Sequence, residues 1–163
     1  MPFAMQPAKF PNGGWPEANA YTPATDQTFS RGTPVTWDAS AQTLDEHAGS
    51  TTVTNILGIA MSGVTTTAVD DPSGKVDVAF ALHPTIFMAK LVGSTGTIQT
   101  VATSNIGVLY GILKVSTLRN AWWGVDEDDT TNVVCEVIDI DVDRNLVYFR
   151  FIDSAVQTAL AFS

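Results

Sequence analysis

From Gly32 onward the chain is a succession of short apolar stretches separated by glycine, proline, asparagine and aspartate. The clearest stretch alternates, so that Val76, Val78, Phe80 and Leu82 would share one face of a strand. Almost no stretch has the apolar repeat of an amphipathic helix. Short strands this close together predict a mainly β fold, a small antiparallel β-barrel or sandwich with little helix.

The strongest hairpin signal lies near the C-terminus. Residues 132–143 and 146–152 are two strand-like stretches joined through Arg144 and Asn145. Strand content should exceed about a third of the residues, and α-helix should stay below about 15%. Side chains on the apolar faces of alternating strands are expected in the core: Val78, Phe80, Val147, Phe149 and Phe151.

For the remaining segments the sequence pattern is weaker or fits more than one structure. Residues 38–49 fit either a short capped helix or a long loop. Gly58, inside an apolar stretch, indicates a bulge or a close approach of another backbone segment. Residues 153–161 favour a short helix capped by Asp153 or Ser154 over a last strand. Further strands are expected at 33–37, 56–61, 76–82, 85–92, 98–102 and 107–115.

The first 32 residues differ from the rest of the chain. Five of the eight prolines lie there, and proline this dense forbids a helix and favours extended chain. Disordered segments usually contain few aromatic residues, whereas this one contains several. We therefore predict an extended arm, residues 1–32, which lies along a partner, and a β domain, residues 33–163. The residues expected to contact the partner are Phe3, Phe10, Trp15, Tyr21 and Phe29.

The charge balance excludes several classes of partner. The chain has eight basic and seventeen acidic residues, a formal net charge of −9. Nucleic acids and anionic membranes are bound mainly through lysine and arginine, so neither is expected as a partner. Charged residues make up only 15% of the chain, and such a surface suits a protein packed against neighbours. The start of the chain lacks the pattern of a secretory signal, so we expect a soluble protein that is made inside the cell.

No matched set of catalytic residues is visible. His47, expected on a surface turn, and His83 belong to no ligand or catalytic spacing. Residues 93–96 lack the lysine and glycine spacing of a phosphate loop. Cys135 stands in an apolar stretch with no basic neighbour, which predicts a buried, unreactive thiol. We therefore expect no enzyme and no cofactor.

Two acidic groups could suggest a metal site. Aspartates alternate over residues 139–143, as at the start of an EF-hand loop. However, Arg144 and Arg150 stand where that loop needs a glycine and a bidentate acid, so no metal site is predicted. The run of four acids at residues 126–129 is interpreted as a solvated loop, because consecutive carboxylates point in different directions.

Two adjacent tryptophans precede that acidic run. If exposed, Trp122 or Trp123 could stack on a sugar or fill a pocket in a partner. On a strand, one of the two would point inward and the other outward, so at most one is free for binding. Both are retained as possible surface contacts.

Several short segments together carry a resemblance. They are GTPVTWD at 32–38, ILGIA at 56–60, TIFMA at 85–89, DTTN at 129–132, VIDID at 137–141 and FRF at 149–151. In pattern and spacing, over roughly residues 32–157, the chain resembles the small head-decoration, or capsid cement, proteins of tailed bacteriophages.

The resemblance implies a β-barrel or sandwich domain, often a homotrimer, that sits on the exterior of the assembled capsid and stabilises it without catalysis. It implies the major capsid protein and neighbouring copies of the chain as partners, synthesis in the host cytoplasm, and termini that reach across neighbouring subunits. Two other interpretations stay open: a tail or head-completion structural protein, and a carbohydrate-binding module that uses an exposed tryptophan.

Overall fold

The computed structural model describes residues 4–9, 18–24, 27–49, 52–65, 75–82, 85–117 and 121–157. Strands make up 51% of these residues and none lies in an α-helix. The mainly β fold predicted from the sequence is thereby confirmed. The sheets are open and stack in the manner of a sandwich instead of closing into a barrel. No helix in this part of the chain is long and apolar enough to cross a membrane.

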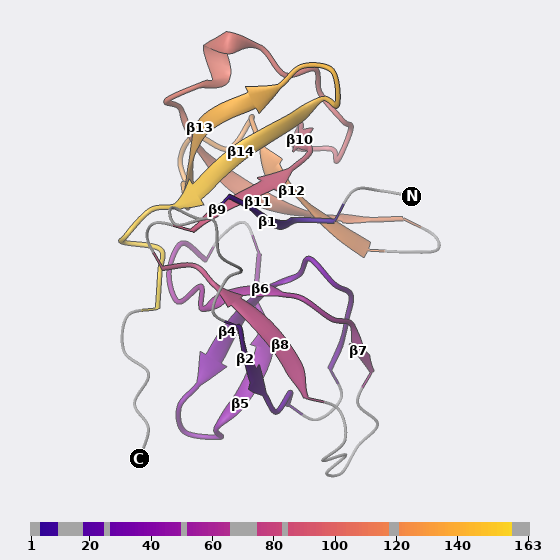
Figure 1. Ribbon diagram of the computed structural model, residues 1–163, viewed down its shortest axis with the longest axis vertical. Helices are drawn as coiled ribbons and strands as arrows, with labels where there is room; N and C mark the ends of the chain where they lie inside the picture. Colours follow the sequence, from indigo (N-terminus) through magenta and orange to yellow (C-terminus); the bar gives the residue numbers. More distant parts are fainter. Residues whose placement is uncertain are drawn as a thin grey trace.

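The larger sheet has seven strands and occupies the upper half of Figure 1. In order across the sheet they are β1 (Gln6–Lys9), β9 (Ile86–Ala89), β14 (Leu146–Phe151), β13 (Cys135–Asp141), β11 (Leu109–Ser116), β12 (Ala121–Asp126) and β10 (Leu91–Val92). Neighbouring strands run antiparallel, apart from β10 and β12, which are parallel. The main core contains a cluster of three rings, Phe87, Phe149 and Phe151, whose centroids lie 5.4 to 5.9 Å apart.

The smaller sheet has five strands and lies in the lower half of Figure 1. In order they are β2 (Ala18–Tyr21), β8 (Val76–Phe80), β6 (Gly58–Ala60), β4 (Pro34–Asp38) and β5 (Thr43–Glu46), each antiparallel to its neighbours. A separate pair is formed by β3 (Thr28–Phe29) and β7 (Val64–Thr65). A second core, which includes Val35, Leu44 and Val78, belongs to this sheet. One short 3-10 turn, η1, spans Thr103–Asn105.

The C-terminal hairpin forms as predicted. β13 and β14 pair antiparallel, and the turn between them ends at Asn145, which takes a φ of 55°. Asparagine tolerates this left-handed conformation better than most residues. Val147, Phe149 and Phe151 are all buried in the main core, as is Val78 in the second core, while Phe80 is only partly buried. Four of the five expected core residues are therefore confirmed as fully buried.

Gly58 confirms the expected close approach of backbone segments. It sits on β6 opposite β8, and a Cβ placed on it would collide with the carbonyl oxygen of Ala79. Any side chain here would push β6 away from β8. A residue without a Cβ is therefore required at this position.

Residues 38–49 form neither a helix nor a long loop. They turn at residues 39–42 and return as β5, so that β4 and β5 make a hairpin. The side chain of Asp38 accepts hydrogen bonds from the main-chain N–H groups of Ser40 (2.8 Å) and Ala41 (3.1 Å). Asp38 thus stabilises a turn. The same side-chain hydrogen bonds could have capped a helix, as predicted, but here they hold the turn between β4 and β5.

Three other expectations are corrected. The alternation of β8 stops at Phe80, and Leu82 is 50% exposed. Residues 98–102 contribute a single bridge, between Ile98 and Val92, in place of a strand. Residues 153–157 form a turn followed by one parallel bridge, Val156 to Ile56, and not the start of a helix. Residues 158–161 lie outside the described chain.

The N-terminal 32 residues, where described, do not stand apart from the β domain. β1 pairs with β9 at the edge of the larger sheet, β2 pairs with β8 at the edge of the smaller sheet, and β3 pairs with β7. Pairing with a sheet of the same chain satisfies the main-chain N–H and C=O groups of these extended segments, so no second protein is needed for that. The expected boundary between an arm, 1–32, and a domain, 33–163, is therefore corrected.

Two of the aromatic residues assigned to a partner instead lie in the second core of the chain itself. Tyr21 and Phe29 are both buried, and the ring of Tyr21 meets Trp37 edge-on at 5.2 Å. Their assignment as partner contacts is corrected, because an extended segment places an aromatic ring wherever its own strand neighbours offer apolar cover. The other three residues, Phe3, Phe10 and Trp15, lie outside the described stretches.

Segments near both chain ends connect the two sheets. At the N-terminal end, Met5 is fully buried in the main core, and a Cβ at Gly32 would meet the Ala4 side chain at 2.8 Å. At the C-terminal end, the chain leaves β14, and the side chain of Gln157 pairs with both main-chain groups of Trp37 on β4, at 2.9 Å each. The side-chain amide of Gln157 thus makes the two main-chain hydrogen bonds that a neighbouring strand would otherwise make with Trp37.

Candidate functional site

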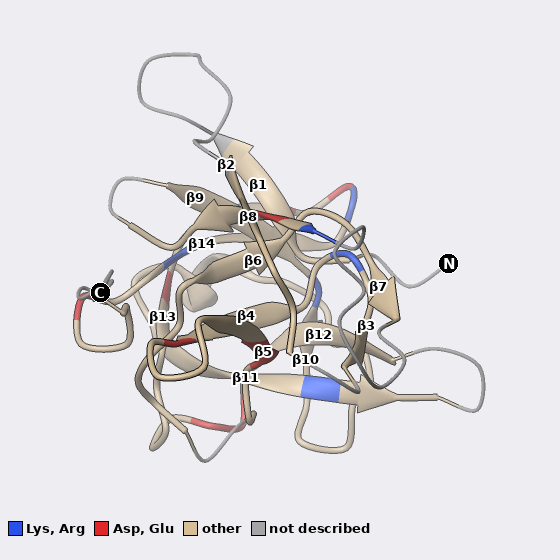
Figure 2. Cartoon of the chain, turned by 90° about the horizontal axis from the view of Figure 1, so that it is seen from below, with Lys and Arg blue, Asp and Glu red and all other residues tan. Residues whose placement is uncertain are grey.

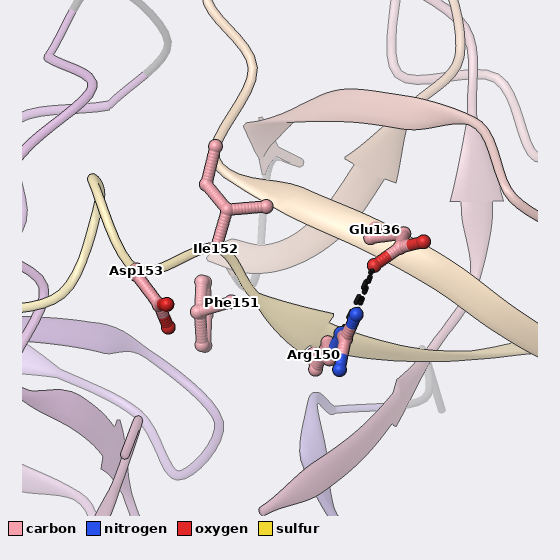
Figure 3. Close-up of a pocket in the computed structure, with 5 residues that line it drawn as sticks. All are labelled: Glu136, Arg150, Phe151, Ile152 and Asp153. Carbon is pink, nitrogen blue, oxygen red and sulfur yellow. Dashed lines mark hydrogen bonds and ion pairs between the residues drawn. The ribbon is translucent and has the colours of Figure 1, made fainter. Parts of the chain in front are cut away.

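The end of β14 lines an open hollow of about 480 Å³. Glu136 on β13 and Arg150 on β14 are directly opposite in the hairpin. The Nε and Nη2 atoms of Arg150 both donate to Oε2 of Glu136, at 2.9 and 2.7 Å (Figure 3). The remaining described lining comes from Phe151, Ile152 and Asp153.

This hollow is suited to binding polar or charged groups. The side chains of Arg150 and Glu136 are 39% and 28% exposed, so water screens the ion pair and the pair can exchange partners. Asp153, which is exposed, adds a second carboxylate. The charged groups of the described lining are the two carboxylates and the guanidinium group of Arg150, which can form hydrogen bonds and ion pairs with a partner.

A second group of polar residues lies at the junction of the two sheets. Glu46, at the end of β5, accepts from Nζ of Lys114 on β11 at 2.8 Å and from Nε1 of Trp123 on β12 at 3.3 Å. A hollow of about 220 Å³ opens beside this pair, and its described lining is Thr28, Phe29, Ser30, Thr33, Glu46, Lys114 and Ala121.

His47, which follows Glu46, is buried and not on a surface turn as expected. Its Nε2 lies 3.2 Å from the carbonyl oxygen of Thr54, and the main-chain N–H of Gly49 donates to its Nδ1 at 3.3 Å. The ring is therefore neutral, with its proton on Nε2. Burial lowers the pKa of His47, and the hydrogen bond with Thr54 partly offsets that effect. His83 lies outside the described residues.

Neither tryptophan is a surface contact. Trp122 and Trp123 are only 8% and 2% exposed to solvent. All residues of β12 from 122 to 126 are buried. Trp123 faces the main core, while the adjacent Gly124 packs against Val92 on the opposite side of the strand. Both faces of β12 are covered, so the rule that one of two neighbours points to solvent does not apply. The assignment of both residues as surface contacts is corrected.

The acidic run at residues 126–129 is only partly a solvated loop. Asp126 is 4% exposed, and burial raises its pKa, with the charges of Asp128 and Asp129 acting in the same direction. Asp128 accepts from the main-chain N–H of Ser94 at 2.8 Å, and Asp129 accepts from that of Asn132 at 2.8 Å. These carboxylates hold neighbouring loops in place, which the sequence pattern did not indicate.

The other chemically notable residues are held by structural contacts. Oδ1 of Asp139 accepts from the N–H of Ile140, and Asp141 accepts from the N–H of Arg144, both at 2.9 Å. Within the stretches that the structure describes, no three acidic, histidine or cysteine side chains could together hold a metal ion. Cys135 is buried, and that burial strongly raises the pKa of its thiol.

Sequence reasoning missed both polar groups. The pair of Glu136 and Arg150 could have been found, because the two residues face each other once the hairpin register is set. The contact between Glu46 and Lys114 joins residues 68 positions apart on different sheets, and no local signal announces it. Comparison of the chain with models of known protein families and with curated proteins finds no match.

Proposed function

We propose that this chain is a non-enzymatic structural protein of a tailed-bacteriophage virion, which binds the outside of the capsid shell and stabilises it. Its partners would be the major capsid protein and neighbouring copies of itself, in a homo-oligomer such as a trimer. The class of protein comes from the sequence resemblance. The structural observation that supports it best is the connection of the two sheets near both chain ends.

Chain ends usually fray unless other contacts hold them. Here the N-terminal stretches supply edge strands to both sheets, and the C-terminal stretch joins Val156 to Ile56 and Gln157 to Trp37. Separating the sheets would require breaking these connections as well as the core. A body held in this way resists distortion, which is the mechanical property that a cement protein needs.

The charge of the molecule indicates what surface it would meet. Acidic residues outnumber basic ones by seventeen to eight, and Figure 2 shows few basic positions on the described chain. Electrostatic complementarity then favours a basic surface on the shell. The half-exposed pair of Arg150 and Glu136 is suited to the polar rim of such a contact.

Binding to isolated shells tests the proposal. Phage shells that lack this protein, mixed with the purified full-length chain, should carry it down on sedimentation and melt at a higher temperature. Asp153→Lys, a charge reversal in the open hollow, should weaken the binding, whereas the exposed Val142→Ala should not. A chain that stays in the supernatant would overturn the proposal. Particles labelled only at the tail or portal would assign the protein to the tail or head-completion class instead.

A further inference from the structure

The hollow at the junction of the sheets combines residues from three separate parts of the chain. β3 and the turn after it supply Thr28, Phe29, Ser30 and Thr33, β5 supplies Glu46, and the hairpin of β11 and β12 supplies Lys114 and Ala121. Its volume is about 220 Å³. At about 30 Å³ for each water in the liquid, that is the space of roughly seven waters. A small polar ligand fits such a space.

The charged residues of this hollow present a donor beside an acceptor. Nζ of Lys114 lies 2.8 Å from Oε2 of Glu46, and the indole N–H of Trp123 donates to Oε1 at 3.3 Å. Trp123 is almost fully buried, which fixes the carboxylate in place. Each carboxylate oxygen can accept more than one hydrogen bond, and an ammonium group has three N–H donors. The pair can therefore hold a ligand while it stays intact.

The rest of the lining is hydroxyl groups and one apolar wall. Thr28 and Ser30 are exposed, and Thr33 is buried, so hydroxyls lie at different depths. Phe29 and Ala121 provide carbon surface. Hydroxyl groups that donate and accept, beside an apolar wall, are complementary to a ligand with the same mixture of C–H and O–H groups.

We propose that this hollow binds a neutral ligand with adjacent hydroxyl groups, of the size of one hexose residue. One hydroxyl would donate to Glu46 while its neighbour accepts from Lys114. A charged ligand is disfavoured, because the two charges of the hollow already neutralise each other and the ligand would lose water without an opposite charge. The site is distinct from a tryptophan stacking platform, and it is independent of binding to a capsid shell.

Nuclear magnetic resonance titration of the full-length chain tests the site. Glucose, galactose and mannose should each be added, along with a linear gluco-oligosaccharide. Main-chain amide signals of residues 28–33, 46 and 114 should shift together, with dissociation constants in the millimolar range. Tighter binding of the oligosaccharide would identify a glycan chain as the source of the ligand, and equal binding would identify the free sugar.

Hydroxyl deletions separate a ligand site from a structural contact. Thr28→Val keeps the side-chain shape and should weaken binding by about threefold to tenfold, the contribution of one hydrogen bond, without changing the melting temperature. Thr65→Val is the matched control, since Thr65 is opposite Thr28 on β7 and does not line the hollow. The proposal would be overturned if the two variants bound the sugars with equal affinity. It would also be overturned if no sugar shifted these amide signals, or if phosphate or lysine amide shifted them and the sugars did not.

Discussion

At the scale of single residues, Phe149 lies in the main core, where its ring packs against those of Phe87 and Phe151. It has no exposed surface. Phe149→Ala should therefore lower the free energy of unfolding by about 3–5 kcal/mol, through lost burial and the cavity left behind. Urea denaturation measures this change. Val142→Ala, at a residue that is 64% exposed, is the control and should change stability by less than about 0.5 kcal/mol.

His47 is the residue from which a pH dependence follows. Its folded-state pKa is lowered by burial, so the folded chain binds the proton less readily than the unfolded chain does. Well above about pH 6.5 both states are neutral at this residue, and its contribution does not change with pH. As the pH falls below that value, the unfolded state takes up the proton first, and stability is lost until the pH reaches the folded-state pKa.

Urea denaturation between about pH 8 and pH 5 measures this effect. The free energy of unfolding should fall across that window, and His47→Gln should flatten the slope because glutamine does not titrate. Val142→Ala, at an exposed residue that does not titrate, is the control and should keep the slope of the parent chain. The comparison uses the slopes and not the absolute stabilities, so a general destabilisation by either substitution does not affect it. Identical slopes in all three proteins would rule out the assignment.

At the scale of elements, the N-terminal strands belong to the folded body. Removing residues 1–30 would delete β1, β2 and β3, together with the buried Met5 and Tyr21. Losing each large buried side chain costs about 2–5 kcal/mol, so these losses together with the lost strand pairing are comparable to the usual stability of a domain. The truncated chain should therefore fail to fold, as seen by circular dichroism. A soluble truncated chain with the native melting temperature would restore the independent arm.

The C-terminal stretch supplies a second element whose contribution can be measured. Gln157→Met keeps the length of the side chain but removes both hydrogen bonds with Trp37. Leaving these main-chain groups without partners should cost about 1–3 kcal/mol in the free energy of unfolding. Asp153→Asn, in the exposed turn of the same stretch, should have almost no effect. If the two variants unfold alike, the amide of Gln157 does not connect the sheets.

At the scale of the whole molecule, two cores are joined by connections near both ends. The main core belongs to the larger sheet and the second core to the smaller sheet. Because the described stretches near both ends and the contact of Glu46 with Lys114 cross between the layers, the two sheets should unfold together. Tryptophan fluorescence and far-ultraviolet circular dichroism should give coincident transitions. Two separate transitions would show that each sheet unfolds by itself.

The parts of the fold that could be predicted are those encoded by neighbouring residues. The hairpin of β13 and β14, with Val147, Phe149 and Phe151 on one face, follows from alternation and a short turn. Trp122 and Trp123 were misjudged, because alternation says which residues share a face but not whether the other face is also covered. His47 was misjudged for the same reason: a polar pattern in the chain does not reveal which loop covers it.

What the sequence by itself determined is the strand class and the C-terminal hairpin, because period-two alternation and turn residues act over a few positions. What only the tertiary structure decided is where the N-terminal strands pair and how Glu46 meets Lys114 and Trp123. These contacts join residues 68 and 77 positions apart. Such contacts depend on how the two sheets stack, and the free energy of stacking comes from the whole set of buried surfaces and not from any local pattern.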